Sequence, residues 1–186
     1  MGNLLDTHLP GPAGRRFTVD AFASREQVWE ALQAFRPADA LAVRLLFSLR
    51  MLRWVRGPVL PFAEGLRRAG FQVVAERRPE EWVVGAAGRF WTPSARIVRL
   101  ASSADFDAFR EPGAAKAAMG FNLESLGPRH TRLTTETRVA CFGAEAERAF
   151  GLYWRAVAPW SALLRRVMLR AVKADAERRA SAVLAA

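Results

Sequence analysis

The last forty residues of the chain predict one long amphipathic helix, and this element most limits what the chain can fold into. From Gly143 to about Ala182, charged and apolar side chains separate onto opposite faces at about 100° per residue. Pro159 falls on the charged face, where water can replace its missing hydrogen bond, so we expect a bend there and not an end. A helix of this length needs a large apolar surface to pack against.

The two faces of this helix have different compositions. The charged stripe comprises Arg148, Arg155, Arg166, Arg170, Lys173 and Glu177. The opposite stripe comprises Phe150, Tyr153, Val157, Ser161, Leu164, Met168 and Ala171, with Trp154 at its flank.

Alternation of apolar and polar residues predicts strands along most of the remaining chain. A strand over 15–22 is followed by a helix over 24–35, with Ser24 and Gln27 spaced as a capping box. Further helices are expected over 38–56, up to residue 69, and from Ser102 or Ser103 to 109. The other strands are expected over 71–76, 81–91, 96–100, 115–124 and 131–141, the last two forming an antiparallel hairpin.

This order of elements predicts an α+β fold. We expect a curved antiparallel sheet wrapped around the C-terminal helix, with extra helices after the first strand. Residues 1–14 contain two prolines and two glycines in their second half and are expected to form an irregular leader. Residues 15–184 are expected to form a single domain.

Cysteine, histidine and hydropathy exclude several classes of protein. Cys141 is the only cysteine, which excludes an internal disulfide framework, and two histidines give little basis for a metal centre. No uncharged apolar run approaches the ~18 residues of a membrane-spanning helix, and the N-terminus has no signal-peptide pattern. We therefore expect a cytoplasmic protein that uses no metal and no cofactor.

The chain is strongly basic, with 28 Lys and Arg against 18 Asp and Glu, or +10. Such a charge can indicate a protein that binds nucleic acid or an anionic membrane. The basic residues are almost all arginine, however, and they are scattered along the chain without a run of five. We interpret them as a solvating coat. Arg44 is the exception, because it projects from the apolar side of the helix expected over 38–56.

Several segments resemble one superfamily. Residues 19–32, with the sequence VDAFASREQVWEAL, are similar to the opening motif of the SRPBCC (START-like, polyketide-cyclase-like) superfamily. Residues 83–91, 131–139 and 150–173 resemble an uncharacterised bacterial branch of it. The resemblance implies a helix-grip fold, in which a sheet and a long helix enclose an apolar cavity that holds lipids, quinones or polyketides. The catalytic residues of the cyclase members are not recognisable here.

The inward faces of the expected strands and helix supply the candidate ligand-binding residues. Aromatic and aliphatic residues dominate, and three hydroxyl-bearing types accompany them. Buried hydroxyls have to find partners, so they are candidates for orienting a ligand, although they can equally bond one another or the backbone. The candidates are Trp82, Val84, Phe90, Met119, Phe121, Leu133, Thr135, Thr137, Val139, Phe150, Tyr153, Trp154, Val157 and Ser161.

Other groups are assigned structural roles. Glu136, with Arg132 and Arg138, falls at even positions and is expected on a solvated outer face as cross-strand ion pairs. We assign no catalytic residue.

Three functions remain open. The first is binding or carriage of an apolar small molecule, lipid-, polyketide- or quinone-like, in the cavity. The second is a cyclase or dehydratase using that cavity, with Tyr153 and Arg44 as its only polar candidates. The third is a basic protein on nucleic acid or an anionic membrane, with nucleic acid the less favoured partner. Trp54 and Trp160, near Leu163 and Val167, suit weak membrane contact.

Overall fold

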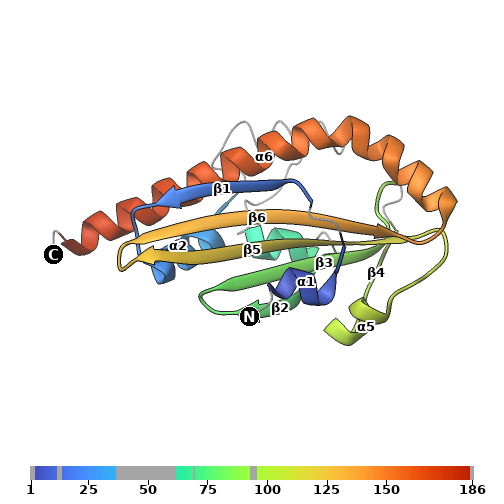
Figure 1. Ribbon diagram of the computed structural model, residues 1–186, viewed down its shortest axis with the longest axis horizontal. Helices are drawn as coiled ribbons and strands as arrows, with labels where there is room; N and C mark the ends of the chain where they lie inside the picture. Colours follow the sequence, from blue (N-terminus) through green and yellow to red (C-terminus); the bar gives the residue numbers. More distant parts are fainter. Residues whose placement is uncertain (1–2, 12–13, 37–61, 69, 93–95, 185–186) are drawn as a thin grey trace. The chain divides into compact units, whose positions relative to one another are not determined.

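The computed structural model describes residues 3–11, 14–36, 62–68, 70–92 and 96–184. It contains an antiparallel six-stranded sheet and a long C-terminal helix, which confirms the expected α+β class (Figure 1). The strand order is β1-β6-β5-β3-β2, and β4 pairs with β3. The strands are β1 Arg16–Ala21, β2 Gln72–Arg77, β3 Glu81–Arg89, β4 Arg96–Val98, β5 Ala115–Gly127 and β6 His130–Cys141.

Except for the first, which lies in the segment expected to be irregular, the described helices end close to the positions that the sequence predicts. They are α1 Leu4–His8, α2 Arg25–Ala34, α4 Phe62–Arg68, α5 Ser103–Ala108 and α6 Ala144–Leu184. The capping box of α2 is confirmed, since Gln27 N–H donates to Ser24 Oγ and Ser24 N–H donates to Gln27 Oε1. Pro159 lies inside α6 at an exposed position, as expected. The helix expected over 38–56, with Arg44, lies outside the described residues.

The chain divides into two compact units, which are described separately below. Unit 1 comprises residues 1–16, 66–122 and 135–156, and unit 2 comprises residues 17–65, 123–134 and 157–186. The strands β5 and β6 and the helix α6 each contribute residues to both units. Among the described residues, no helix combines the length and apolar character needed to cross a membrane.

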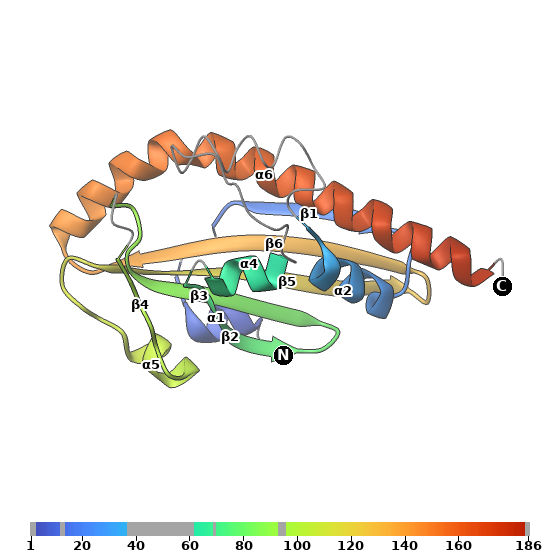
Figure 2. The ribbon, with the colours of Figure 1, turned by 180° about the vertical axis from the view of Figure 1, so that it is seen from behind.

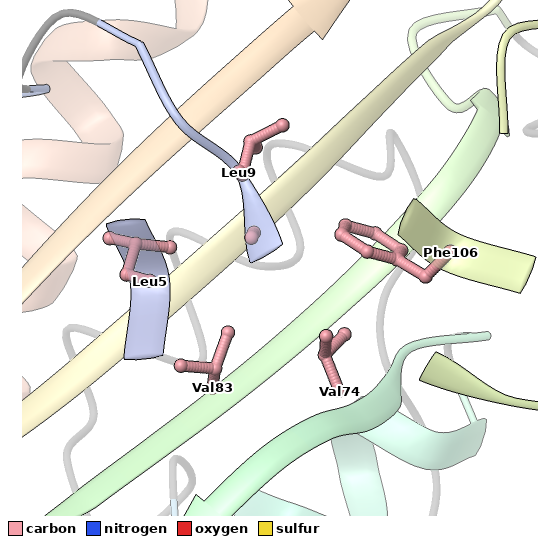
Figure 3. Close-up of a cluster of buried hydrophobic side chains, with 6 residues drawn as sticks. Leu5, Leu9, Val74, Val83 and Phe106 are labelled. Atoms are coloured by element: carbon pink, nitrogen blue, oxygen red, sulfur yellow. The ribbon is translucent and has the colours of Figure 1, made fainter. Parts of the chain in front are cut away.

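The first residues of the chain are not wholly irregular, because α1 packs against the sheet of unit 1. Both views show α1 beside the β2–β3 pair (Figures 1 and 2). Leu5 and Leu9 are 1% and 3% exposed. They belong to a buried cluster from α1, α5 and three strands, whose other members are Val74, Val83, Phe106 and Ala118 (Figure 3). We name this side of the unit 1 sheet the leader face.

Two glycines let side chains approach the leader face closely. A Cβ at Gly85 would lie 2.7 Å from the Phe106 ring and 2.8 Å from Val74, and one at Gly120 would lie 3.1 Å from Leu5. Gly88 has a φ of +129°, which favours glycine, whereas Gly85 leaves room for Phe106.

Candidate functional site

Opposite the leader face, unit 1 carries a sheet face rich in the predicted ligand-binding residues. The register of β3 and β5 places Trp82 opposite Phe121 and Val84 opposite Met119. The Trp82 and Phe121 rings are stacked, with centroids 5.4 Å apart, and both are almost fully buried. Val83 and Ala118 belong to the leader face cluster, so the alternation of a strand puts these four side chains on the other side. We name it the site face.

Phe150 of α6 is the centre of an aromatic cluster at the end of β3. Its ring centroid lies 5.9 Å from that of Phe90, 6.0 Å from that of Tyr153 and 5.8 Å from those of Trp91 and Trp154. All five rings are half-buried. The structure thus brings together four predicted residues and adds Trp91. Strand alternation predicts that Phe90 lies on the inward face if the strand continues to residue 91. The strand β3 ends at Arg89, so alternation does not determine the direction of the Phe90 side chain.

On β6 the same face carries a buried hydroxyl that no described residue hydrogen-bonds. Glu136 and Arg138 contact the N-terminal segment, so alternation along β6 directs Thr135, Thr137 and Val139 to the site face. Thr135 is fully buried, and its Oγ1 has no hydrogen-bond partner among the described residues. An unpaired buried hydroxyl costs about 1–3 kcal/mol. Thr137 and Val139 are half-buried.

Three predicted residues belong to unit 2. Leu133 is fully buried in β6, and Val157 and Ser161 are half-buried on α6. The structure therefore places eleven of the fourteen candidates, all but these three, within unit 1.

The expectation that Glu136 and Arg138 are solvated is wrong, because both side chains are buried. Glu136 accepts from Arg138 Nε at 2.7 Å, from Arg16 Nε at 2.6 Å and from the Gly14 N–H at 2.8 Å. Arg138 also forms an ion pair with Asp6 and donates to the Leu9 carbonyl. Strand alternation alone predicts that Glu136 and Arg138 are exposed to water. They are buried because the N-terminal segment packs over them.

These contacts decide the ionisation of Glu136. Burial opposes the charged carboxylate, but the hydrogen bonds from Arg138, Arg16 and Gly14 outweigh it and lower the pKa of Glu136 below its ordinary value. Arg132, by contrast, is half-buried and pairs with Asp20 through two hydrogen bonds of 2.8 and 3.0 Å. Glu136 is therefore charged at neutral pH, and its hydrogen bonds attach Gly14 and Arg16 to β6.

Two further basic residues, Lys116 and Arg165, are buried and therefore do not belong to the solvated positive surface. Lys116 is 3% exposed and donates to the carbonyls of Phe106 and Asp107 at the end of α5. Burial lowers its pKa, with the nearby Arg110 acting in the same direction. Arg165 on α6 is 9% exposed, and burial lowers its pKa to about 10. Burial also raises the pKa of the Cys141 thiol, which disfavours the reactive thiolate.

Unit 2 contains an open pocket that the sequence did not indicate. It has a volume of about 470 Å³ and is lined by Thr18, Val19, Asp20, Arg132 and Lys173. Its charges are already engaged, because Asp20 pairs with Arg132 and Lys173 Nζ donates to the Asp20 carbonyl at 2.7 Å. The exposed pair of Trp160 and Leu163, expected near a membrane, also lies in unit 2, at 48% and 43% exposure.

Comparison with known proteins finds solved structures to which this chain is similar. No family model and no curated protein sequence matches the chain. A conserved protein from Geobacillus kaustophilus is 12% identical, with a TM-score of 0.43 over 88% of this chain and 94% of that one. The Zhui aromatase/cyclase from Streptomyces sp. R1128 is 18% identical, with a TM-score of 0.33 over 89% and 93%. The di-domain aromatase/cyclase BexL from the BE-7585A biosynthetic pathway is 14% identical, with a TM-score of 0.36 over 89% and 47%.

Proposed function

We propose that the site face of unit 1 binds an apolar small molecule with a planar aromatic body and a carbonyl or hydroxyl group. The observation that carries this proposal is Thr135, whose buried Oγ1 has no partner within the described part of the chain and lies on the same sheet face as the stacked Trp82 and Phe121. A ligand carbonyl would accept its O–H. The site therefore has the composition of small-molecule sites, which are mainly apolar with a few placed polar groups.

The aromatic cluster around Phe150 supports the same ligand class. Its five rings are half-buried, whereas the residues of the leader face cluster are almost fully buried. Rings that keep exposed surface lose it when a planar molecule stacks on them, which gains about 25 cal/mol for each Å². The leader face, by contrast, is filled by Leu5, Leu9 and Phe106.

Membership of the SRPBCC superfamily, with its helix-grip cavity, belongs to this proposal. The segments at 19–32, 83–91, 131–139 and 150–173 support it by their resemblance to the superfamily. Binding or carriage is the role we propose, because the residues gathered on the site face offer hydroxyls and rings but no carboxylate or histidine for acid–base chemistry.

The test compares two ligands of one shape. The first is 2-acetylnaphthalene, which has a carbonyl, and the second is 2-ethylnaphthalene, which does not. Quenching of tryptophan fluorescence measures binding, since Trp82 lies on the site face and stacks on Phe121. We expect the Thr135→Val variant to lose about three- to tenfold in affinity for the ketone, the value of one hydrogen bond, and nothing for the hydrocarbon.

The matched control is Thr134→Val, one residue away on the opposite side of β6. It should leave both affinities unchanged. Phe121→Ala should weaken both ligands equally, because it removes one of the stacked rings, while thermal unfolding checks that each variant folds. If neither naphthalene binds the wild-type protein, or if Thr134→Val and Thr135→Val behave alike, the proposal is wrong.

A further inference from the structure

One side of α6 in unit 2 exposes large apolar side chains next to arginines. Trp160 is 48% exposed and Leu163 is 43% exposed. Arg166 and Arg170 follow along the helix and are exposed as well. At about 100° per residue, these four side chains fall within about one third of the helix circumference. They form one stripe on α6, the helix drawn in orange to red in Figure 1, and we name it the basic aromatic stripe.

The side of α6 opposite this stripe is the side that packs in unit 2. Its apolar residues are almost fully buried, and they are Ala162, Met168, Leu169, Val172 and Ala176. The outer side of such a helix is ordinarily polar. Trp160 and Leu163 depart from that pattern. An exposed tryptophan and leucine beside arginines are typical of helices that lie in a membrane–water interface.

The charges of the basic aromatic stripe are all positive. Neither of its arginines has an acidic residue within one turn of the helix, since α6 contains no Asp or Glu between residues 157 and 174. The acidic residues that follow are engaged elsewhere. Asp175 forms ion pairs with arginines one turn further along, and Glu177 forms one with Lys173. The stripe therefore presents a net positive charge to solvent.

An anionic lipid surface is the partner that uses both features of the stripe. Tryptophan favours the depth of the lipid headgroups, because its ring is apolar and its N–H keeps a polar partner there. Arginine extends its methylene groups along apolar surface while its guanidinium stays among the phosphates. Nucleic acid would pair with the arginines, but it would give the Leu163 side chain little apolar surface to contact.

We propose that the basic aromatic stripe binds the surface of an anionic lipid bilayer. Trp160 and Leu163 enter the headgroup layer, and Arg166 and Arg170 bind the lipid phosphates. The contact is peripheral and reversible, because two apolar side chains and two charges supply only modest affinity. The stripe lies in unit 2 and shares no residue with the site face of unit 1, so this proposal does not depend on the proposed function.

Flotation of the purified protein with lipid vesicles measures the binding. One set of vesicles is phosphatidylcholine alone, and the other contains about one third phosphatidylglycerol, which supplies the negative surface potential. We expect wild-type protein to bind the anionic vesicles at least about tenfold more tightly at low salt, since each arginine near such a surface contributes about fivefold. Added salt should reduce this preference, because it screens the charges.

Two pairs of variants separate the stripe from the rest of the surface. Arg170→Gln should weaken binding to the anionic vesicles about fivefold, whereas Arg129→Gln, in the exposed β5–β6 turn, should change it by less than about twofold. Trp160→Ser should weaken it about tenfold by removing apolar contact. Leu126→Ser, at a 39% exposed position of β5, should have no effect. Thermal unfolding checks each variant, and Leu163→Ser replaces Trp160→Ser if the latter does not fold.

Several results would overturn the inference. They are equal binding of wild-type protein to neutral and anionic vesicles, equal losses in Arg170→Gln and Arg129→Gln, and full binding by both Trp160→Ser and Leu163→Ser. Release of the protein from vesicles by duplex DNA at the same phosphate concentration would show a general polyanion site. A dimer that Trp160→Ser converts to a monomer would show that a second copy covers the stripe. Failure of the site-face proposal appears separately, as no binding of 2-acetylnaphthalene.

Discussion

Glu136 and Arg138 lie two positions apart in β6 and form an ion pair of 2.7 Å, although their side chains are only 5% and 6% exposed. Both point to the leader face, where residues from the first sixteen of the chain complete their hydrogen bonding. The charges of one strand thus attach the N-terminal segment to the sheet.

The first prediction concerns pH. Because the folded-state pKa of Glu136 lies below its ordinary value of 4.5, folding favours the carboxylate. Its stabilising effect is complete above the pKa of the unfolded chain and is lost as the pH falls through the folded value. We expect the free energy of unfolding, measured with urea from pH 7 to pH 3, to fall below about pH 4.5.

The Glu136→Gln variant should lose about 2–4 kcal/mol at pH 7, because it leaves Arg138 buried with fewer acceptors. Its dependence on pH should also be shallower. Glu124→Gln, at an exposed position on β5, should change stability by no more than about 0.5 kcal/mol. Equal effects at the two positions would contradict the role of the buried network.

The second prediction contrasts two fully buried threonines of β6. Thr131 Oγ1 donates to the Ala23 carbonyl at 2.9 Å, whereas Thr135 Oγ1 has no partner among the described residues. Thr131→Val should therefore cost about 1–2 kcal/mol, and Thr135→Val should be neutral or stabilising. Thermal unfolding of the ligand-free protein measures both. A comparable loss at Thr135 would show that its hydroxyl is already satisfied.

The third prediction tests the close packing on the leader face. A methyl group at Gly85 would overlap Phe106 and Val74, so Gly85→Ala should destabilise the protein by about 1–3 kcal/mol. Gly65 lies in α4 with nothing within 4 Å of its Cβ position. Gly65→Ala should stabilise by up to about 1 kcal/mol through helix propensity. Urea unfolding gives both values, and the same sign for the two variants would refute the packing argument.

The fourth prediction asks whether the N-terminal segment is part of the fold. Leu5→Ala should cost about 2–5 kcal/mol, as for other buried leucines. The same change at Leu152, which is 67% exposed, should cost little. Limited proteolysis should cleave the Leu5→Ala protein within its first fifteen residues sooner than wild type. If the two leucines are equivalent, α1 is dispensable.

Sequence periodicity predicted the elements well, because it reports which side of each element is apolar. The strands at 81–91 and 131–141, the cap at Ser24 and the long C-terminal helix are all found close to their expected positions. Periodicity does not show which other segment of the chain covers a given face of the sheet. Leu5 and Leu9, four residues apart, were the available signal for a short helix on the sheet.

The arginine pair at 165 and 166 shows a second limit. Adjacent residues of a helix point about 100° apart. When two adjacent arginines lie at the border of the charged stripe, one side chain is therefore more exposed to solvent than the other. Arg166 belongs to that stripe and is exposed, and Arg165 turns to the buried side. The grouping of rings around Phe150 likewise depends on residues from β3 and α6 that only the fold brings together.

The attachment of the N-terminal segment has a consequence for how the protein is made. The Gly14 N–H and the Glu136 carboxylate that it contacts are 122 positions apart. The ribosome therefore synthesises the N-terminal segment long before β6, which supplies the Glu136 and Arg138 side chains that this segment contacts. Leu5 and Leu9 have no sheet to cover until β2, β3 and β5 have been made, so for that time the nascent chain carries an exposed apolar segment at its leading end. Closure of the leader face can be completed only late in synthesis, and chaperones have that interval in which to bind it.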